Sequence, residues 1–547
     1  MTNLLDNNYH YQYYLQKYFG VSVVSTTVKN FYPLRAVSRL TPLVMAIALI
    51  SPFSAHATEA QSANQLDQAQ LQSHQFHQDH VLGTSLDVVI TGVSKQQAKT
   101  AYKAIESEIA RLDKILSTWR DDSEISQLNR EKNIQASPEL FEVIAACETM
   151  RHQTCGAFDA RLGQLIALWE KSQGIQKLDQ NTRAQVIAQL DQNSVFLDQD
   201  SKTIAIDSAV KFAPDAYAKG YIIDRALAVA REKVPAIQGL LVDIGGDMRV
   251  WGQAPNKQNQ TADQQGWSIG VQSAFNHFDN VAPDQVLNLK DQAIAFSGKG
   301  YRNLAGQSHL LDPKTGAPLQ QVEQCVVVGQ CAAQADALAT ALAAMTPSEG
   351  LELIDALVGY ESKLTTADGQ VFQSNGWNNL VHTQSQADML NVASSSSAKW
   401  PAGYQAVLDL NIPKLDVEKY RAPYVVVWVT DKDKKIVRTL AVWGKDEKWI
   451  NTNYVWWRRY GRQMTSLDAV AKPSRQPGNY KLAWDGKDDH GKPVAAGQYQ
   501  VHIETAREHG DHSYQTINLD VKAKPSAQTL AAQKEIGTLK LNFQKVN

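Results

Sequence analysis

The stretches SHLLDPKTGAP at residues 308–318 and ADALAT at residues 335–340 are the most informative part of this sequence. Asp-Pro and Thr-Gly-Ala-Pro form turns, so we expect His309 at the end of a strand, where the chain enters a rigid bend. Asp336 and Thr340 are four residues apart in an alanine-rich helical stretch and project from one face. Either fragment alone is more often structural than catalytic. Together, two oxygen donors beside a fixed histidine indicate phosphate chemistry with a divalent cation.

Five further segments occur in a fixed order within residues 75–380. They are LGT at 82–84, LSTWRDDSEISQLN at 116–129, GAFD at 156–159, AKGYIID at 218–224 and VDIGGD at 242–247. Together with the two stretches above, they resemble the motifs of the FAD:protein FMN transferases, the ApbE-type family. One such segment would be weak evidence, whereas seven in the family's order are strong evidence.

The resemblance implies which residues bind the flavin nucleotide. Leu82 stands where the family usually has a methionine that packs on the flavin, and leucine keeps the apolar contact. Trp119 replaces a tyrosine that stacks on the flavin. The other residues that the resemblance implies for FAD binding are Ala157, Phe158, Asp159, Lys219 and His309.

The resemblance also implies a Mg²⁺ site, formed by the side chains of Asp336 and Thr340 and the carbonyl of Ala216. His309 would act as an acid/base group or as a phosphate donor. The implied reaction transfers FMN from FAD to a threonine of an exported or membrane redox protein, through a phosphoester bond, and releases AMP. With water as the nucleophile, the same site would be an FAD pyrophosphatase. A non-catalytic flavin-binding redox module is the third hypothesis.

One departure from the family pattern precedes the AKGYIID segment. The family usually has an aspartate at the position of Ala213, and here Asp215 follows two residues later. Either Asp215 supplies the missing acceptor from a shifted loop, or one contact to FAD is lost. The metal site is unaffected, because Ala216 would contribute only its backbone carbonyl.

Composition places the chain among globular proteins with more than one domain. It has 547 residues, of which 43% are hydrophobic and 20% charged, and this is too long for one ordinary core. The formal net charge is only -2, and no long basic run is present, so we expect no nucleic-acid partner.

The first 57 residues are typical of an export segment. Arg35 and Arg39 precede an apolar stretch over residues 40–53, and Ala55 and Ala57 offer a small-residue cleavage pattern. We therefore expect a periplasmic protein. If the segment stays uncleaved it would be a membrane tether, with the protein at the inner membrane, although it is short for a span.

Four cysteines would allow three disulfide pairings in an exported protein, and the sequence does not choose among them. They are Cys147, Cys155, Cys325 and Cys331. In an extended strand, Cys325 and Cys331 would lie roughly 20 Å apart, so we expect no bond between them.

The sequence predicts an α+β transferase domain over residues 75–383, a serine-rich linker over 384–402, a β-sandwich domain over 403–525 and a tail over 526–547. Helical periodicity is clear at 95–117, 137–150, 216–232 and 332–344, and strands are predicted at 86–91, 239–242, 267–271 and 324–328. Alternating runs at 405–411, 424–430, 436–443, 480–484, 499–506 and 514–521 predict a small immunoglobulin-like sandwich.

The C-terminal part resembles a predicted periplasmic β domain, of unassigned function, that follows some ApbE-type proteins. If Trp456 and Trp457 lie on a strand, they point to opposite faces and at least one is exposed.

Overall fold

The structure is a computed structural model. It describes residues 73–171, 178–192, 194–255, 266–275, 280, 283–299, 308–381, 400–417, 420–444, 450–463, 474–489, 491–522 and 524–545. The predicted export segment and nearly all of the predicted serine-rich linker lie outside these residues. None of the described helices is long and apolar enough to cross a membrane. All four cysteines are described, and all are free.

The N-terminal domain is built on an eight-stranded antiparallel sheet in the order β1-β2-β6-β7-β10-β11-β12-β13. Its strands are β1 (His74–Val81), β2 (Thr84–Thr91), β6 (Gly239–Ile244), β7 (Asp247–Gly252), β10 (Ala293–Gly298), β11 (Val322–Gly329), β12 (Glu361–Thr366) and β13 (Val371–Gln373). The middle of β11 is buried on both faces: Cys325 and Val327 pack into one core and Val326 and Val328 into the other. This explains why β11 reads as a continuous apolar run.

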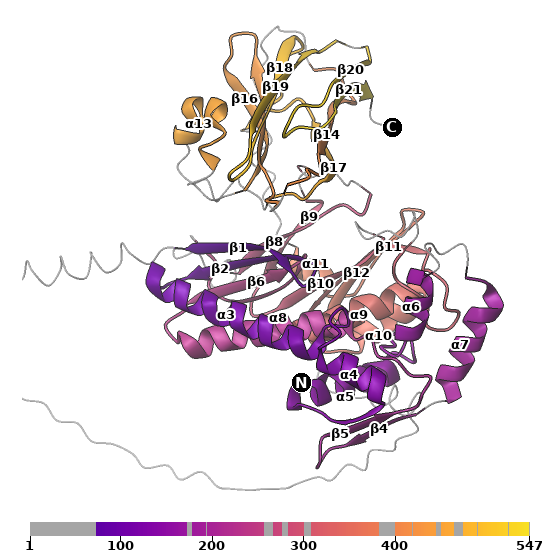
Figure 1. Ribbon diagram of the computed structural model, residues 1–547. Coiled ribbons are helices and arrows are strands. Elements are labelled where there is room, and N and C mark those ends of the chain that lie inside the picture. The colour runs from indigo at the N-terminus through magenta and orange to yellow at the C-terminus, as the bar shows by residue number, and fades with distance from the viewer. Residues whose placement is uncertain are drawn as a thin grey trace, which may run out of the picture.

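Three long helices cover one face of this sheet (Figure 1). They are α3 (Lys95–Leu116), α8 (Asp215–Lys233) and α9 (Ala332–Ala344). Helix α3 begins at a capping box formed by Ser94 and Gln97, and its buried residues recur at three- and four-residue spacing. The predicted helices 95–117, 216–232 and 332–344 are thus confirmed.

The opposite face is covered by a two-stranded hairpin and a short helix. The hairpin consists of β8 (Trp267–Val271) and β9 (Gln285–Leu289), and the helix is α11 (Trp377–Leu380). Trp267 and Trp377 pack with Val326 of β11 in this second core. The large sheet therefore lies between two apolar layers.

Smaller elements complete the N-terminal domain. Strands β3 (Asn133–Gln135), β4 (Val195–Asp198) and β5 (Thr203–Ile206) form a separate sheet in the order β3-β5-β4. The remaining helices are α4 (Glu124–Glu131), α5 (Pro138–Gln153), α6 (Gly163–Lys171), α7 (Gln180–Gln192) and α10 (Pro347–Asp355). The domain thus mixes helices with antiparallel sheets, as predicted.

The C-terminal domain contains two four-stranded antiparallel sheets among its described residues, in the orders β17-β14-β21-β20 and β16-β15-β18-β19. Its strands are β14 (Tyr404–Ile412), β15 (Tyr424–Asp431), β16 (Ile436–Trp443), β17 (Gly478–Trp484), β18 (Gln498–Ala506), β19 (His512–Asp520), β20 (Ser526–Leu530) and β21 (Leu539–Lys545). Residues from both sheets share one core. The six predicted strands are therefore confirmed, and the domain is sheet-rich; its immunoglobulin-like character stays a prediction.

The predicted tail over residues 526–547 was wrong, because β20 and β21 belong to the first sheet. Strand β21 pairs with β14 on one side and β20 on the other. Leu539, Leu541 and Phe543 are buried in the shared core. The β domain therefore extends to Lys545.

The outer face of the second sheet is covered by a short helix, α13 (Tyr454–Arg459), followed by the 3-10 turn η4 (Gly461–Gln463). Trp456 and Trp457 therefore lie on a helix, and the premise that they occupy a strand was wrong. Trp456 is fully buried and Trp457 is half-buried. The buried Glu504 carboxylate fixes the start of this helix, because it accepts the N–H groups of Val455 and Trp456, each at 2.8 Å.

Candidate active site

A cluster of two carboxylates and one amine lies where α8, β7 and α9 meet. Lys219 Nζ is 2.5 Å from Asp247 Oδ2, and Asp247 Oδ1 accepts the N–H of Phe296 at 2.9 Å. Asp336 is 3% exposed, and its Oδ2 has no hydrogen-bond partner within the described part of the chain. Burial raises the pKa of Asp336 to about 7, and the nearby carboxylate of Asp247 contributes to this rise. The Lys219 ammonium group and the Gly220 N–H act in the opposite direction, because they stabilise the ionised carboxylate. The cluster thus contains a buried carboxylate that lacks full compensation.

Close packing of α8 against α9 brings Lys219 and Asp336 together. A Cβ on Gly220 would lie 2.3 Å from the Ala332 carbonyl oxygen, so only glycine allows this approach. Asp224 accepts the N–H groups of Ala332 and Ala333, each at 3.0 Å, at the start of α9. The AKGYIID segment therefore contains the residues that dock and cap the helix that carries Asp336.

Thr340 follows Asp336 by four residues on α9, and its hydroxyl lies 3.1 Å from Ser297 Oγ. Ser297 directly follows Phe296, which donates its N–H to Asp247. The end of β10 therefore joins the two parts of the site. Sequence reasoning missed both Ser297 and the role of Asp247, because these contacts link residues far apart in the chain.

The backbone that leads to Ala216 is fixed by two other family-like segments. Asn129 donates to the Phe212 carbonyl at 2.9 Å and accepts the Phe212 N–H at 2.7 Å. The N–H of Ala213 donates to the Ala160 carbonyl at 2.7 Å. These bonds hold the chain at the start of α8, whose first turn contains Ala216. In a regular helix the Ala216 carbonyl accepts the N–H of Gly220. The Gly220 N–H also lowers the pKa of Asp336, because it stabilises the ionised carboxylate.

Trp119 lies beside this start of α8 and is 82% exposed. The neighbouring Thr118 hydroxyl donates to the Asp215 carboxylate at 3.3 Å. An exposed indole is an open stacking surface, as its predicted role with flavin requires. Asp215 already has Thr118 as a partner, and its replacement of the aspartate missing at Ala213 stays a prediction.

Leu82 lies in the two-residue turn between β1 and β2. Both Leu82 and Gly83 have positive φ, 49° and 77°, as a type I′ hairpin turn requires. Thr84, the first residue of β2, packs against Gly245, where an added Cβ would lie 2.7 Å from Thr84 Cγ2. Gly245 precedes Asp247 by two residues, so the hairpin turn lies beside the carboxylate cluster.

The GAFD segment faces inward. Ala157 and Phe158 are buried in the core of the domain. Asp159 Oδ2 lies 2.6 Å from Arg161 Nη2 in a largely buried ion pair. These side chains support the neighbouring Ala160, which holds Ala213. Their direct contact with FAD stays a prediction.

His309 lies at the surface, at the start of the predicted turn. The Asp312 carbonyl accepts the Gly316 N–H at 2.7 Å, and the Asp312 carboxylate accepts the Thr315 hydroxyl at 2.8 Å, which confirms the turn. The indole N–H of Trp169 in α6 donates to the Gly316 carbonyl at 3.2 Å. The residues before Ser308 that would form the predicted strand lie outside the described ranges, and the approach of His309 to the carboxylate cluster stays a prediction.

The donors of the candidate metal site are all oxygens: the Asp336 carboxylate, the Thr340 hydroxyl and the Ala216 carbonyl. Mg²⁺ prefers such hard donors and is usually bound by one or two carboxylates plus substrate phosphates. The unpartnered Asp336 Oδ2 fits this requirement. Across the described ranges no three His, Cys, Asp or Glu side chains gather as a metal site.

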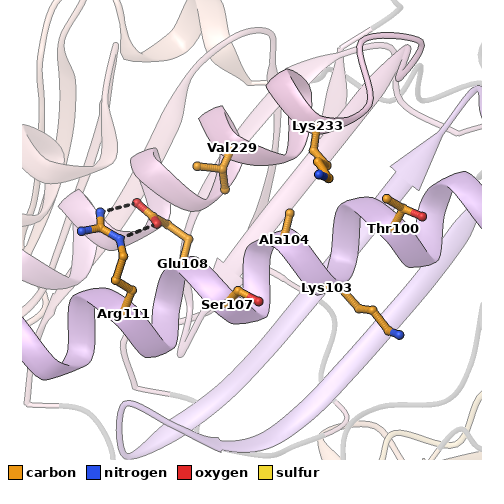
Figure 2. Close-up of a pocket in the computed structure, with 8 residues that line it drawn as sticks. All are labelled: Thr100, Lys103, Ala104, Ser107, Glu108, Arg111, Val229 and Lys233. Atoms are coloured by element: carbon orange, nitrogen blue, oxygen red, sulfur yellow. Dashed lines mark hydrogen bonds and ion pairs between the residues drawn. The ribbon is translucent and has the colours of Figure 1, made fainter.

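Two other features do not belong to this site. A groove of about 530 Å³ runs between α3 and α8, and Figure 2 shows the Glu108–Arg111 ion pair and Lys233 along it. It contains none of the predicted site residues.

In the β domain, His502 is buried and both ring nitrogens have partners, Thr430 at 2.9 Å and Tyr514 at 2.7 Å. Burial lowers its pKa to about 4, so this histidine is a neutral core residue.

Comparison with known proteins adds the family. The model of the ApbE family matches residues 82–362, and a second model, described as a predicted periplasmic protein (DUF2271), matches residues 405–538. The FAD:protein FMN transferase of Chlamydia muridarum is 28% identical over 47% of this chain and 79% of that protein. The one from Salmonella typhimurium is 23% identical over 50% of this chain and 79% of that protein. The solved ApbE protein of Thermotoga maritima is 24% identical, covers 57% of this chain and 100% of that chain, and has a TM-score of 0.49.

Proposed function

The chain belongs to the ApbE family, and on that premise we propose that it is an FAD:protein FMN transferase. It would move FMN from FAD to a threonine of an exported or membrane redox protein and release AMP. The observation that carries the proposal is the cluster of Lys219 with the buried carboxylates of Asp247 and Asp336. The relatives named above, which are transferases of this kind, support it.

The charge balance of the cluster suits it to a divalent cation, through which it can bind a pyrophosphate. Lys219 supplies one positive charge to two buried carboxylates, Asp247 and Asp336, and uncompensated charge is costly in a buried position. Asp336, Thr340 and the Ala216 carbonyl would hold Mg²⁺. When bound, Mg²⁺ would supply the positive charge that offsets the phosphate oxygens of FAD as AMP leaves.

The protein's own groups would orient the substrate. Trp119 offers an open face for stacking, and Leu82 offers an apolar contact from a rigid turn. Lys219 is partly exposed and is fixed by Asp247, so its ammonium group can reach the nucleotide without losing its orientation. These residues bind and position FAD rather than react with it.

The chemical step requires a proton acceptor. The threonine oxygen of the acceptor protein attacks the FMN-side phosphorus, the bond from this phosphorus to the bridging oxygen breaks, and AMP departs with that oxygen. His309 would take the hydroxyl proton. If water attacks instead, the products are FMN and AMP, so transfer and hydrolysis differ in the nucleophile that reaches the phosphorus.

We place this reaction in the periplasm. The DUF2271 match over residues 405–538 is described as a predicted periplasmic protein, which agrees with the export signal expected at the N-terminus. Association with the inner membrane would depend on the first 57 residues, which lie outside the described part of the chain.

The test is a three-way assay with purified protein, FAD and Mg²⁺. The acceptor would be a purified exported redox domain with an exposed threonine. Transfer gives AMP and covalent flavin fluorescence on the acceptor, hydrolysis gives AMP alone, and a flavin-carrying module gives neither. Chelation of Mg²⁺ should stop AMP release. AMP without acceptor labelling would replace the transferase proposal with a pyrophosphatase.

A further inference from the structure

Strand β17 lies at the edge of its sheet and is covered there by a residue of the N-terminal domain. Asn280, from the connection between β8 and β9, donates through Nδ2 to the Ala483 carbonyl at 2.5 Å. Its Oδ1 accepts the Ala483 N–H at 2.8 Å. A carboxamide carries a donor and an acceptor side by side, as a peptide group does. Asn280 therefore makes the pair of bonds that a neighbouring strand would make with β17.

The register of β17 shows that these two backbone groups are otherwise unused. Ala483 stands opposite Val407 of β14. In an antiparallel pair, alternate residues turn their N–H and C=O groups away from the partner strand. Ala483 uses both groups for Asn280, so Leu482 and Trp484 are the residues that bond to β14. Without Asn280, Ala483 would be an open position on a sheet edge.

A second contact joins the same edge to the hairpin of β1 and β2. Gln476, two residues before β17, lies with Nε2 3.2 Å from His80 Nε2. His80 is the irregular residue of β1, because the register with β2 shifts between Asp79 and Val81. Such a bulge redirects a side chain away from its regular position. Two separate segments of the N-terminal domain therefore contact β17 and the residues just before it.

The second contact links the β domain to the strand that leads into the Leu82 turn. His80 precedes Leu82 by two residues, and the Leu82-Gly83 turn packs through Thr84 on Gly245, next to Asp247. Figure 1 shows the β domain on the side of the sheet that carries β8 and β9, opposite α3, α8 and α9. The residue Gln476, just before β17, thus contacts the β1–β2 hairpin, whose turn is expected to touch the flavin.

We propose that β17 and the preceding Gln476 dock the β domain on the transferase domain by contacting Asn280 and His80, and that the docked domain forms part of the surface that receives the acceptor protein. The second half rests on the proposed function. Two-point contacts from separate segments fix an orientation, which a serine-rich linker alone would not do. A domain held at the strand that leads into the Leu82 turn would lie close to the residue that is expected to contact the flavin.

The docking is tested on the full chain by residue-resolved hydrogen exchange. In the double variant Asn280→Ala, Gln476→Ala, the Ala483 N–H should exchange at least about tenfold faster, because it loses its acceptor. The N–H groups of Leu482 and Trp484 should keep their protection from β14. Asn133→Ala, an exposed asparagine on β3, is the matched control. Rapid exchange of Ala483 in the unmodified protein would overturn the docking.

The acceptor role is tested with the same proteins and the same redox domain as acceptor. The double variant should raise the KM for the acceptor severalfold while AMP release from FAD without acceptor stays unchanged. An unchanged acceptor KM would overturn the receiving role even if the exchange result supports docking. If the unmodified protein transfers no flavin at all, the proposed function fails and this role fails with it, while hydrogen exchange still decides the docking.

Discussion

Asp336 lies in a region where two carboxylates, its own and that of Asp247, are close to a single ammonium group, that of Lys219. Its Oδ2 has no hydrogen-bond partner within the described residues, and burial raises its pKa to about 7. A buried carboxylate without a full complement of positive charge lowers the stability of the fold. Carboxylates with such perturbed pKa values are concentrated at functional sites, where a bound ligand can supply the charge. The incomplete charge compensation of Asp336 therefore supports its proposed role in binding a metal ion.

We expect Asp336→Ala to abolish Mg²⁺-dependent AMP release while FAD still binds. A bound metal contributes several kcal/mol to the stabilisation of developing charge, so the loss should be roughly 10²-fold or more. The rate of AMP release across a Mg²⁺ titration and the quenching of FAD fluorescence measure the two effects. Asp336→Asn keeps the side-chain volume and should show the same loss, whereas Asp200→Ala, at an exposed turn, should change neither. Full Mg²⁺-dependent turnover in the Asp336 variants would remove the metal assignment.

We expect His309→Ala to lower the rate by roughly 10²-fold or more, the usual effect of losing a positioned acid/base group. The fold should stay intact, because Asp312 holds the turn without the imidazole. Single-turnover transfer rates and the thermal unfolding midpoint are the measurements. Lys314→Ala, exposed on the same turn, is the control. A wild-type rate in His309→Ala would reduce His309 to a structural residue of the turn.

Sequence patterns predicted the local relations within the candidate site better than the contacts between distant residues. Asp336 and Thr340 fall on one helix, as their spacing predicted, because that relation is local. The ion pair of Lys219 with Asp247 joins α8 to β7, and no local pattern encodes such a long-range contact. Ser297 had no signal at all, since an isolated serine at a strand end is common.

At the scale of elements, the tight packing of α8 on α9 positions the site. Local periodicity predicted residues 332–344 as a helix, and its helical bounds are the observed ones. The sequence did not reveal that α9 lacks a side-chain cap of its own and is capped by Asp224 from α8. The missed strand β21 did carry a signal, the alternation of Leu539, Leu541 and Phe543, but its partner β14 lies more than a hundred residues earlier.

We expect Gly220→Ala to destabilise the transferase domain. Alanine is favoured over glycine within a helix by roughly 1 kcal/mol, but its Cβ would meet the Ala332 backbone at 2.3 Å. The overlap should prevail and lower the free energy of unfolding by about 1–3 kcal/mol. Urea unfolding measures this, and Mg²⁺-stimulated AMP release should fall because α9 carries Asp336. Gly497→Ala, where an added Cβ meets nothing within 4 Å, is the control; equal stability of the two variants would contradict the packing argument.

At the scale of the whole molecule, the two domains have separate cores, and Asn280 and His80 make contacts between the domains. Every residue of the candidate site lies in the N-terminal domain, whose core does not include the β domain. The predicted boundary between the domains rests on the composition of the serine-rich segment. This composition did not predict the contacts of Asn280 with β17 and of His80 with Gln476, because an isolated asparagine or histidine carries no pairing signal.

A chain that ends at Thr383 should therefore bind FAD and release AMP at close to the full-length rate, because Lys219, Asp247, Asp336 and Thr340 are all retained. Transfer to the redox domain should weaken, because the surface beside the Leu82 turn would be missing. Equilibrium FAD binding, AMP release and covalent flavin labelling, each measured on both chain lengths, separate these effects. If the shorter chain loses FAD binding although it is folded by circular dichroism, the β domain contributes to the flavin pocket and the domain boundary is wrong. If labelling of the acceptor is equally fast in both chains, the β domain has no part in receiving it.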